Sequence, residues 1–195
     1  MPSFFASGVP EYPANADIIH TDTKVRHFAI FETAVGACGI AWSDRGIAGF
    51  QLPEDDVVST RRRMQSRCPG GEEAVPPSDV QRSIDAITSL MRGERTDLTF
   101  VPLDMDGIPD FHRRVYEVAR TIRPGETMTY GDIAKRLGDA GAARAVGQAL
   151  GRNPFAVIVP CHRVVAAGGK AGGFSAGGGT ATKLQLLAIE GAQLF

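Results

Sequence analysis

The sequence contains little cysteine and no long apolar run. Three cysteines occur in 195 residues, at positions 38, 68 and 161, and none of them form a CxxC pair. Because the cysteines are few and odd in number, they exclude a disulfide framework and a zinc ribbon. No apolar run approaches the roughly 20 residues of a transmembrane helix, and residues 1–20 lack the basic and apolar regions of a secretory signal. We therefore expect a cytoplasmic protein with free thiols and no membrane attachment.

Net charge is also small. The whole chain carries −1, which alone argues against a nucleic-acid-binding protein. The charge is unevenly distributed, however: residues 1–110 have a net charge of −7 and residues 111–195 a net charge of +6. The basic half is the candidate for binding phosphates, although an accident of surface composition would give the same asymmetry.

The first half of the chain predicts an α/β domain at residues 21–105, after an N-terminal arm at residues 1–20. Three apolar runs separated by turn residues indicate an antiparallel meander, with strands at 26–33, 36–43 and 45–52. Charge placement and apolar spacing predict helices at 54–67 and 80–93, and a further strand is expected at 97–103. No pattern of reactive residues is evident in this half.

The second half, residues 106–195, predicts a mainly helical domain. A helix is expected at 109–122, with a proline at its start. Two shorter helices, at 130–138 and 141–153, are separated by a short break that contains glycine. Such a pair is typical of the helix-turn-helix motif of DNA-binding proteins.

Alanine and glycine dominate the second helix of this pair, in which Arg144 is the only long side chain near the start. A helix that reads the major groove carries several long polar side chains, whereas small residues permit close approach to a narrow surface such as the minor groove. A tightly packed core helix has the same composition. The arginine favours DNA binding, because a charged side chain fits a core poorly.

Cys161 lies in the stretch PCHRVV, between Pro160 and His162. The general expectation for a cysteine is a buried, inert side chain. Its neighbours indicate a reactive one, because the proline restricts the backbone and His162 and Arg163 supply an imidazole and a positive charge that would stabilise a thiolate. If the segment is a strand, His162 faces away from the sulfur and reaches it only through a water or a turn. Asn153, before a proline, makes an ordinary turn or a hydrogen bond back to the cysteine segment.

These segments resemble the O6-alkylguanine-DNA alkyltransferases, also called methylated-DNA–protein-cysteine methyltransferases. The resemblance rests on PCHRVV, on the preceding RAVGQALGRNP and on the following LLAIEGA, and it is strong from residue 111 to residue 191. It implies a ribonuclease-H-like α/β first domain of antiparallel strands and helices. It also implies a second domain with a winged helix-turn-helix that binds the minor groove of DNA.

The resemblance further implies roles for individual residues around the thiol. Cys161 matches the alkyl acceptor, and His162 and Glu190 match the groups that help to deprotonate it through a water. Asn153 matches a hinge asparagine. Tyr130 matches a tyrosine near the flipped base that donates a proton to a ring nitrogen.

On the DNA side, Arg144 matches an arginine finger that enters the base stack, and Ala143 and Arg152 are expected to contact DNA as well. Ser175 matches a serine near the guanine oxygen, in a loop that is longer and richer in glycine than the family pattern. Phe174 stands where a tyrosine is common, so that any hydroxyl role is lost there.

The implied function is DNA repair by transfer of an alkyl group from O6-alkylguanine in double-stranded DNA to Cys161, with O4-methylthymine a second candidate substrate. A soft thiolate suits attack on a saturated carbon, and no cofactor or metal is expected. The base must flip out of the duplex, and the stable thioether would end activity after one transfer by a monomer. Two alternatives stay open: a non-catalytic protein of the same fold that recognises alkylated bases, and a cysteine hydrolase, for which adjacent Cys and His have poor geometry.

Overall fold

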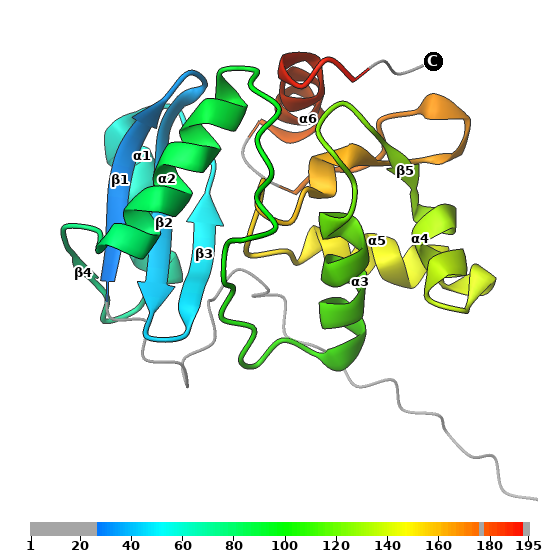
Figure 1. Cartoon of the computed structure of the whole chain (residues 1–195), viewed down its shortest axis with the longest axis horizontal. Coiled ribbons are helices and arrows are strands. Elements are labelled where there is room, and N and C mark those ends of the chain that lie inside the picture. Colours follow the sequence, from blue (N-terminus) through cyan, green and yellow to red (C-terminus); the bar gives the residue numbers. More distant parts are fainter. Residues whose placement is uncertain (1–26, 176–177, 193–195) are drawn as a thin grey trace, which may run out of the picture.

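A four-stranded sheet with helices on both faces forms the first half of the protein (Figure 1). The computed structural model describes residues 27–175 and 178–192, so the predicted N-terminal arm lies outside the described residues. Strands β1 (His27–Thr33), β2 (Gly36–Ser43) and β3 (Gly46–Gln51) form the predicted antiparallel meander. The short β4 (Glu72–Glu73) pairs in parallel with β1, which gives the order β3-β2-β1-β4.

Helices α1 (Val57–Arg67) and α2 (Ser78–Met91) cover opposite faces of this sheet (Figure 1), near the positions that the sequence predicts. Side chains alternate between the two faces along a strand. Phe28 of β1 therefore packs with Met64 of α1, whereas its neighbour Ala29 belongs to the larger core that includes Ile87 of α2. Asp56 caps α1, because its carboxylate accepts a hydrogen bond from Ser59 N at 2.6 Å.

The strand predicted at residues 97–103 is wrong. Within this segment Leu103 makes an isolated bridge to Ile47, and no regular strand is formed. The chain instead crosses the outer edge of β3, where Ile47 N donates to Pro102 O at 2.8 Å. Leu98 and Val101 are buried, so the apolar pattern of the segment reflects a packed loop that covers a sheet edge.

The second half is mainly helical, as predicted. The three expected helices are α3 (Asp110–Arg120), α4 (Tyr130–Arg136) and α5 (Ala143–Gly151), and α6 (Gly179–Ile189) follows the glycine-rich loop. A capping box fixes the start of α4: Thr129 Oγ1 accepts from Asp132 N, and the Asp132 carboxylate accepts from Thr129 N, both at 3.1 Å. Strands β5 (Met128–Thr129) and β6 (Val164–Val165) pair in parallel. No helix among the described residues is both long and apolar enough to cross a membrane.

The two halves share one continuous hydrophobic core. It contains Phe50 of β3 and Ile87 of α2 together with Tyr116 of α3 and Phe155. A backbone hydrogen bond of 2.8 Å from Phe50 N to Pro154 O joins the edge of β3 to the segment that leads to Cys161. The sheet of the first half therefore directly supports the loop that carries the candidate nucleophile.

Candidate active site

Cys161 begins a short 3-10 helix, Cys161–Arg163, at the end of a tightly folded loop. Within this loop Val159 N donates to Phe155 O and Cys161 N donates to Val159 O, both at 2.8 Å. Val157 is buried and has a φ of 72°, a conformation that costs a residue other than glycine about 1–3 kcal/mol. The strand considered for this segment is therefore wrong, and the apolar run before the cysteine is a compact buried loop.

Asn153 holds the two ends of this loop together. Its Oδ1 accepts a hydrogen bond from Phe155 N at 2.9 Å, which closes the turn before the loop. Its Nδ2 donates to Val159 O at 2.8 Å, two residues before Cys161. Both roles considered for Asn153 from the sequence therefore occur, since one side chain makes the turn and fixes the cysteine segment to the end of α5.

Behind the thiol, one buried carboxylate joins two side chains of the PCHRVV stretch. Glu190 lies at the C-terminal end of α6. Its Oε1 is 2.9 Å from His162 Nε2, and each of its two carboxylate oxygens accepts a hydrogen bond of 2.8 Å from Arg163. Arg163 also donates to Ile122 O at 2.6 Å. Burial acts to raise the pKa of Glu190, but the hydrogen bonds and charges of its two partners outweigh burial and lower that pKa to about 2.

His162 is fully buried, and its bonding fixes which ring nitrogen can take a proton. An ionised carboxylate only accepts hydrogen bonds, so Nε2 donates to Glu190 and Nδ1 carries the lone pair. Nδ1 makes no hydrogen bond to any residue that the structure describes. Burial lowers the pKa of His162 and outweighs the effect of Glu190 in the opposite direction, so the imidazole is neutral near pH 7 and able to act as a base.

The Cys161 side chain is partly exposed and is protonated at rest. Burial of the sulfur raises the pKa of the thiol, whereas the hydrogen bond from Asn153 and the charge of Lys183 act to lower it. The guanidinium of Arg163, which the sequence predicted to stabilise the thiolate, is paired with the Glu190 carboxylate. The prediction that Arg163 acts at the thiol is therefore wrong. Lys183 supplies that charge instead, and a base must remove the thiol proton during any reaction.

Lys183 is a residue that sequence reasoning missed. It lies on α6 with its side chain fully buried, and its Nζ donates to Val164 O at 2.6 Å and lies 5.9 Å from the centre of the Tyr130 ring. Its spacing in the sequence could have identified it: Lys183 lies three residues before the buried Leu186 and four before the buried Leu187, so it is on the same face of the helix. A lysine on the apolar face of a helix needs a specific partner.

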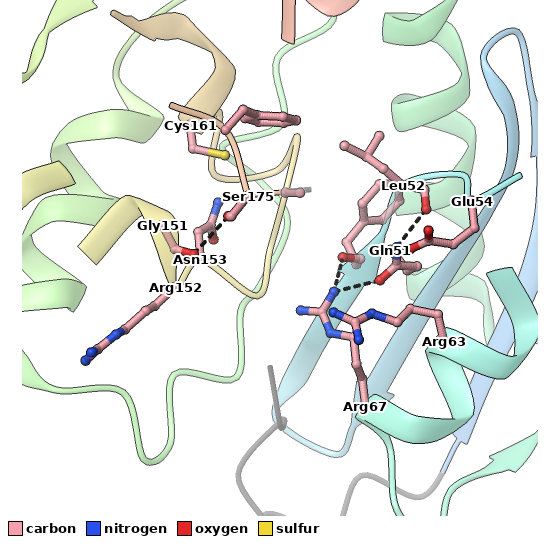
Figure 2. A pocket seen from close by; sticks show the side chains of 13 residues that line it. Gln51, Leu52, Glu54, Arg63, Arg67, Gly151, Arg152, Asn153, Cys161 and Ser175 are labelled. Atoms are coloured by element: carbon pink, nitrogen blue, oxygen red, sulfur yellow. Dashed lines mark hydrogen bonds between the residues drawn. The ribbon is translucent and has the colours of Figure 1, made fainter. Parts of the chain in front are cut away.

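Two cavities meet at Cys161. The larger has a volume of about 550 Å³ and is bounded by α4, α5 and the glycine-rich loop. The smaller has a volume of about 50 Å³ and lies between the two halves of the protein, as Figure 2 shows. Four residues line both cavities: Gly151, Cys161, Phe174 and Ser175.

Three of the four residues predicted for the DNA side line the larger cavity: Ala143, Arg144 and Ser175. Cys161 and the predicted catalytic residue Tyr130 line it as well, and the Arg144 side chain is exposed. Ser175 Oγ donates to Gly151 O at 2.9 Å. Gln148, which the sequence analysis overlooked, is exposed one helical turn after Arg144 and lines the same cavity; its spacing of four residues was the available signal.

Arg152 lies apart from this group. It follows α5 as its C-terminal cap and lines the smaller cavity, and its side chain points away from Cys161 (Figure 2). The structure therefore does not bring Arg152 and Arg144 to one cavity, although both are exposed.

Comparisons with known proteins show what the chain is similar to. Residues 110–192 match the family model of the 6-O-methylguanine DNA methyltransferase DNA-binding domain. The chain is 46% identical over 150 residues to the methylated-DNA–protein-cysteine methyltransferase of Mycobacterium tuberculosis, covering 75% of this chain and 88% of the relative. The enzyme of that name from Methanothermobacter thermautotrophicus is 33% identical over 156 residues, or 80% of each chain.

Solved structures show the same similarity. The crystal structure of Mycobacterium tuberculosis OGT in complex with DNA superposes with a TM-score of 0.66 at 34% identity, and the match covers 85% of this chain and 92% of that one. The O6-methylguanine-DNA methyltransferase from Pyrococcus kodakaraensis also gives a TM-score of 0.66, at 29% identity, over 85% of this chain and 99% of that one.

Proposed function

The chain belongs to the methylated-DNA–protein-cysteine methyltransferase family, and on this premise we propose that it repairs DNA by transferring an alkyl group from O6-alkylguanine in a duplex to Cys161. One observation supports the choice of acceptor above all others. Cys161 borders both cavities, whereas Cys38 and Cys68 are buried, and burial raises the pKa of each of these two thiols to about 12.

The reaction is an in-line displacement. A bond forms between Cys161 Sγ and the alkyl carbon while the bond from that carbon to guanine O6 breaks, and the electron pair of the broken bond stays on the guanine. The thiol proton passes through a water to His162 Nδ1, and the Glu190 carboxylate stabilises the imidazolium that forms. The guanine receives a proton at a ring nitrogen from Tyr130, which is then reprotonated, so that overall the thiol proton replaces the alkyl group. Burial raises the pKa of Tyr130 and keeps it protonated before transfer.

DNA is the partner, and α5 is the element that meets it. Its exposed residues Arg144 and Gln148 border the larger cavity, while the small side chains beside them, such as Ala143, allow the helix to approach the minor groove closely. The alkylated base flips out of the stack into this cavity, Arg144 fills the gap that it leaves, and Ser175 lies near the guanine oxygen. Arg152 contacts the DNA backbone outside the cavity.

We further propose that the first domain, residues 21–105, is ribonuclease-H-like. The second, residues 106–195, contains a winged helix-turn-helix in which α4 and α5 are the helix pair. The protein acts as a monomer, since one site contains every group that the reaction uses. The cytoplasmic location and the arm at residues 1–20 stay predictions.

Intact-mass measurement after incubation with a duplex containing O6-methylguanine tests this function. We expect the protein to gain one methyl group, mapped to Cys161 by peptide analysis, with no second transfer by the same molecule. Binding of the duplex with unchanged mass would instead support the non-catalytic alternative. Repeated turnover with unchanged mass would support a hydrolase.

A further inference from the structure

Gln148 is the second long side chain on the exposed face of α5, and the reaction as described so far gives it no role. It follows Arg144 by four residues, so the two side chains extend from the same face of the helix, and both line the larger cavity beside Cys161. Gln148 is exposed, and its side-chain amide bonds to no residue that the structure describes. Its two N–H donors and its carbonyl acceptor are therefore available to a partner that approaches α5.

The order of residues along α5 places Gln148 between the gap in the base stack and the thiol. Arg144, which would fill the gap, lies in the first turn. Gly151 ends the helix on the cavity wall that Cys161 shares, where its carbonyl accepts from Ser175 Oγ (Figure 2). Four residues of helix span about 6 Å, and base pairs are stacked about 3.4 Å apart. Side chains of a helix lean toward its N-terminus, which brings the Gln148 amide toward the base pair next to the gap.

The surface of α5 around Gln148 leaves room for the edge of a base pair. Gly147 precedes this residue, and Gly151 follows it within one turn. A Cβ atom at Gly147 would make an ordinary contact of 3.8 Å with the Tyr130 ring, and one at Gly151 would meet no atom of the described residues within 4 Å. Packing among these residues therefore requires glycine at neither position. Since neither glycine has a side chain, Arg144 and Gln148 extend farthest from this face of the helix.

The minor groove presents one group that an amide distinguishes. A·T and T·A pairs show only the acceptors N3 and O2 there, whereas a G·C pair adds the N2 amino donor of guanine. The guanidinium of Arg144 only donates, so it cannot accept from this amino group. The Gln148 amide donates through Nε2 to N3 or O2 of any pair, and it accepts through Oε1 from guanine N2 alone. Both ends of the amide are therefore satisfied only at a G·C pair.

We propose that Gln148 contacts the minor-groove edge of the base pair next to the lesion and makes repair faster where that pair contains guanine. The inference rests on the proposed function, and the chemical step at Cys161 is unchanged. The contact is to a base that stays in the duplex, so it affects transfer from duplex DNA and not from a free base. Because Gln148 lies to one side of Arg144 along α5, the preference is confined to one side of the lesion.

Single-turnover rates on duplexes that contain O6-methylguanine test the proposal. The neighbouring pair, on each side in turn, is guanine·cytosine, inosine·cytosine, adenine·thymine or 2,6-diaminopurine·thymine. Inosine removes the N2 amino group from guanine, and diaminopurine adds the same group to adenine. The measured quantity is the ratio of the rates with and without this group, compared between wild type and variant, because the effect of the group on pairing strength is common to both.

On one side of the lesion, Gln148→Ala should lower this amino-group ratio roughly threefold in both matched comparisons, the loss of about one neutral hydrogen bond. Gln148→Leu keeps most of the bulk of the side chain without the amide and should lower the ratio equally. Transfer from a free alkylated guanine analogue should stay at the wild-type rate in both variants. Gln65→Ala, which removes an exposed glutamine of α1 that does not line the cavity, is the matched control and should keep the wild-type ratio.

Three outcomes would overturn the proposal. An amino-group ratio that is the same in the wild type and in both Gln148 variants would show that the residue does not read the neighbouring pair. Equal slowing by Gln148→Ala on duplex and free base would place the amide against the flipped base instead. Weaker binding of Gln148→Ala to undamaged duplexes, equal for every sequence, would make the residue a contact to the DNA backbone. Failure of the proposed function is distinct, because the wild type would then take up no methyl group from any of these duplexes.

Discussion

The buried and the open side of Cys161 are built in different ways. On the buried side, His162, Arg163 and Glu190 are joined by hydrogen bonds of 2.8–2.9 Å, and their side chains are almost entirely removed from solvent. On the open side, Arg144 and Ser175 are exposed at the rim of a cavity. The groups that would move protons are thus ordered before any substrate arrives, whereas the groups that would recognise DNA are accessible to it.

Because of this difference, substitutions on the two sides should differ in whether they change stability as well as activity. A buried charge that loses its partner destabilises the fold, so substitutions on the buried side should affect both the rate of transfer and the free energy of unfolding. An exposed side chain with few partners contributes little to folding, so substitutions on the open side should change the rate alone. The following predictions test this separation, starting from the residue that both sides share.

Replacing the nucleophile should give the largest effect. Cys161→Ser should reduce methyl transfer below detection and leave binding to damaged duplex largely intact, because a hydroxyl is a far poorer nucleophile at neutral pH. Radiolabelled methyl transfer and a binding titration measure the two quantities. Cys38→Ser and Cys68→Ser are the controls and should transfer normally. Methyl uptake by Cys161→Ser, or label on either of the other cysteines, would refute the assignment of the acceptor.

Glu190→Gln should combine a loss of rate with a loss of stability. It leaves Arg163 buried without a carboxylate, which should cost about 3 kcal/mol of unfolding free energy, and it no longer stabilises a protonated His162 during transfer. Denaturant unfolding and single-turnover kinetics measure both effects, and Glu94→Gln, at an exposed site, is the control. A normal rate across neutral pH would remove Glu190 from the active site.

The same carboxylate predicts the acid dependence of stability. The pKa of Glu190 is about 2 in the folded protein, below its ordinary value of 4.5. A lowered pKa contributes stability that is present above the unfolded value and is lost as the pH falls toward the folded value. Wild-type unfolding free energy should therefore fall between pH 4.5 and pH 2, and the fall should be smaller for Glu190→Gln. Parallel curves for the two proteins would contradict the coupling.

The sequence predicted elements that depend on local patterns and missed contacts between distant segments. The meander of β1 to β3 and helices α3 to α5 follow from turn residues and apolar spacing, which are local. The strand prediction at residues 97–103 was wrong because a buried loop and a strand have the same apolar pattern. The partners of Arg163 and the buried position of Lys183 depend on where α6 packs, and periodicity carries no such information. The neighbours of Cys161 in the sequence, His162 among them, already indicated a reactive thiol, whereas the roles of Cys161 as alkyl acceptor and of Glu190 came from motif resemblance.

On the open side, Arg144→Ala should affect duplex substrates selectively. If the side chain fills the gap left by a flipped base, its loss should slow transfer from duplex DNA roughly tenfold or more. Transfer from a free alkylated guanine analogue should hardly change, because no flipping is required, and thermal stability should stay that of the wild type. Arg92→Ala, at an exposed site in the first half, is the control. Equal slowing on both substrates would mean that Arg144 shapes the pocket instead.

Ser175→Ala should give the smallest effect and the clearest contrast with the buried side. The Ser175 side chain is exposed, and among the described residues its hydroxyl bonds to Gly151 O, so its removal should leave the unfolding free energy within error. A single neutral hydrogen bond to the guanine oxygen is worth about 0.5–1.5 kcal/mol, so transfer should slow by roughly two- to tenfold. The slowing should be equal on duplex and free base, because the contact is to the base itself and not to the gap in the stack.

Ser66→Ala is the control. It removes an exposed hydroxyl that also bonds to a backbone carbonyl, that of Arg63, and so tests the loss of such a bond far from the thiol. If the Ser175 variant transferred the methyl group as fast as the Ser66 variant, Ser175 would have no role in the proposed site. A loss of stability would instead show that the open side, too, is held together before DNA binds.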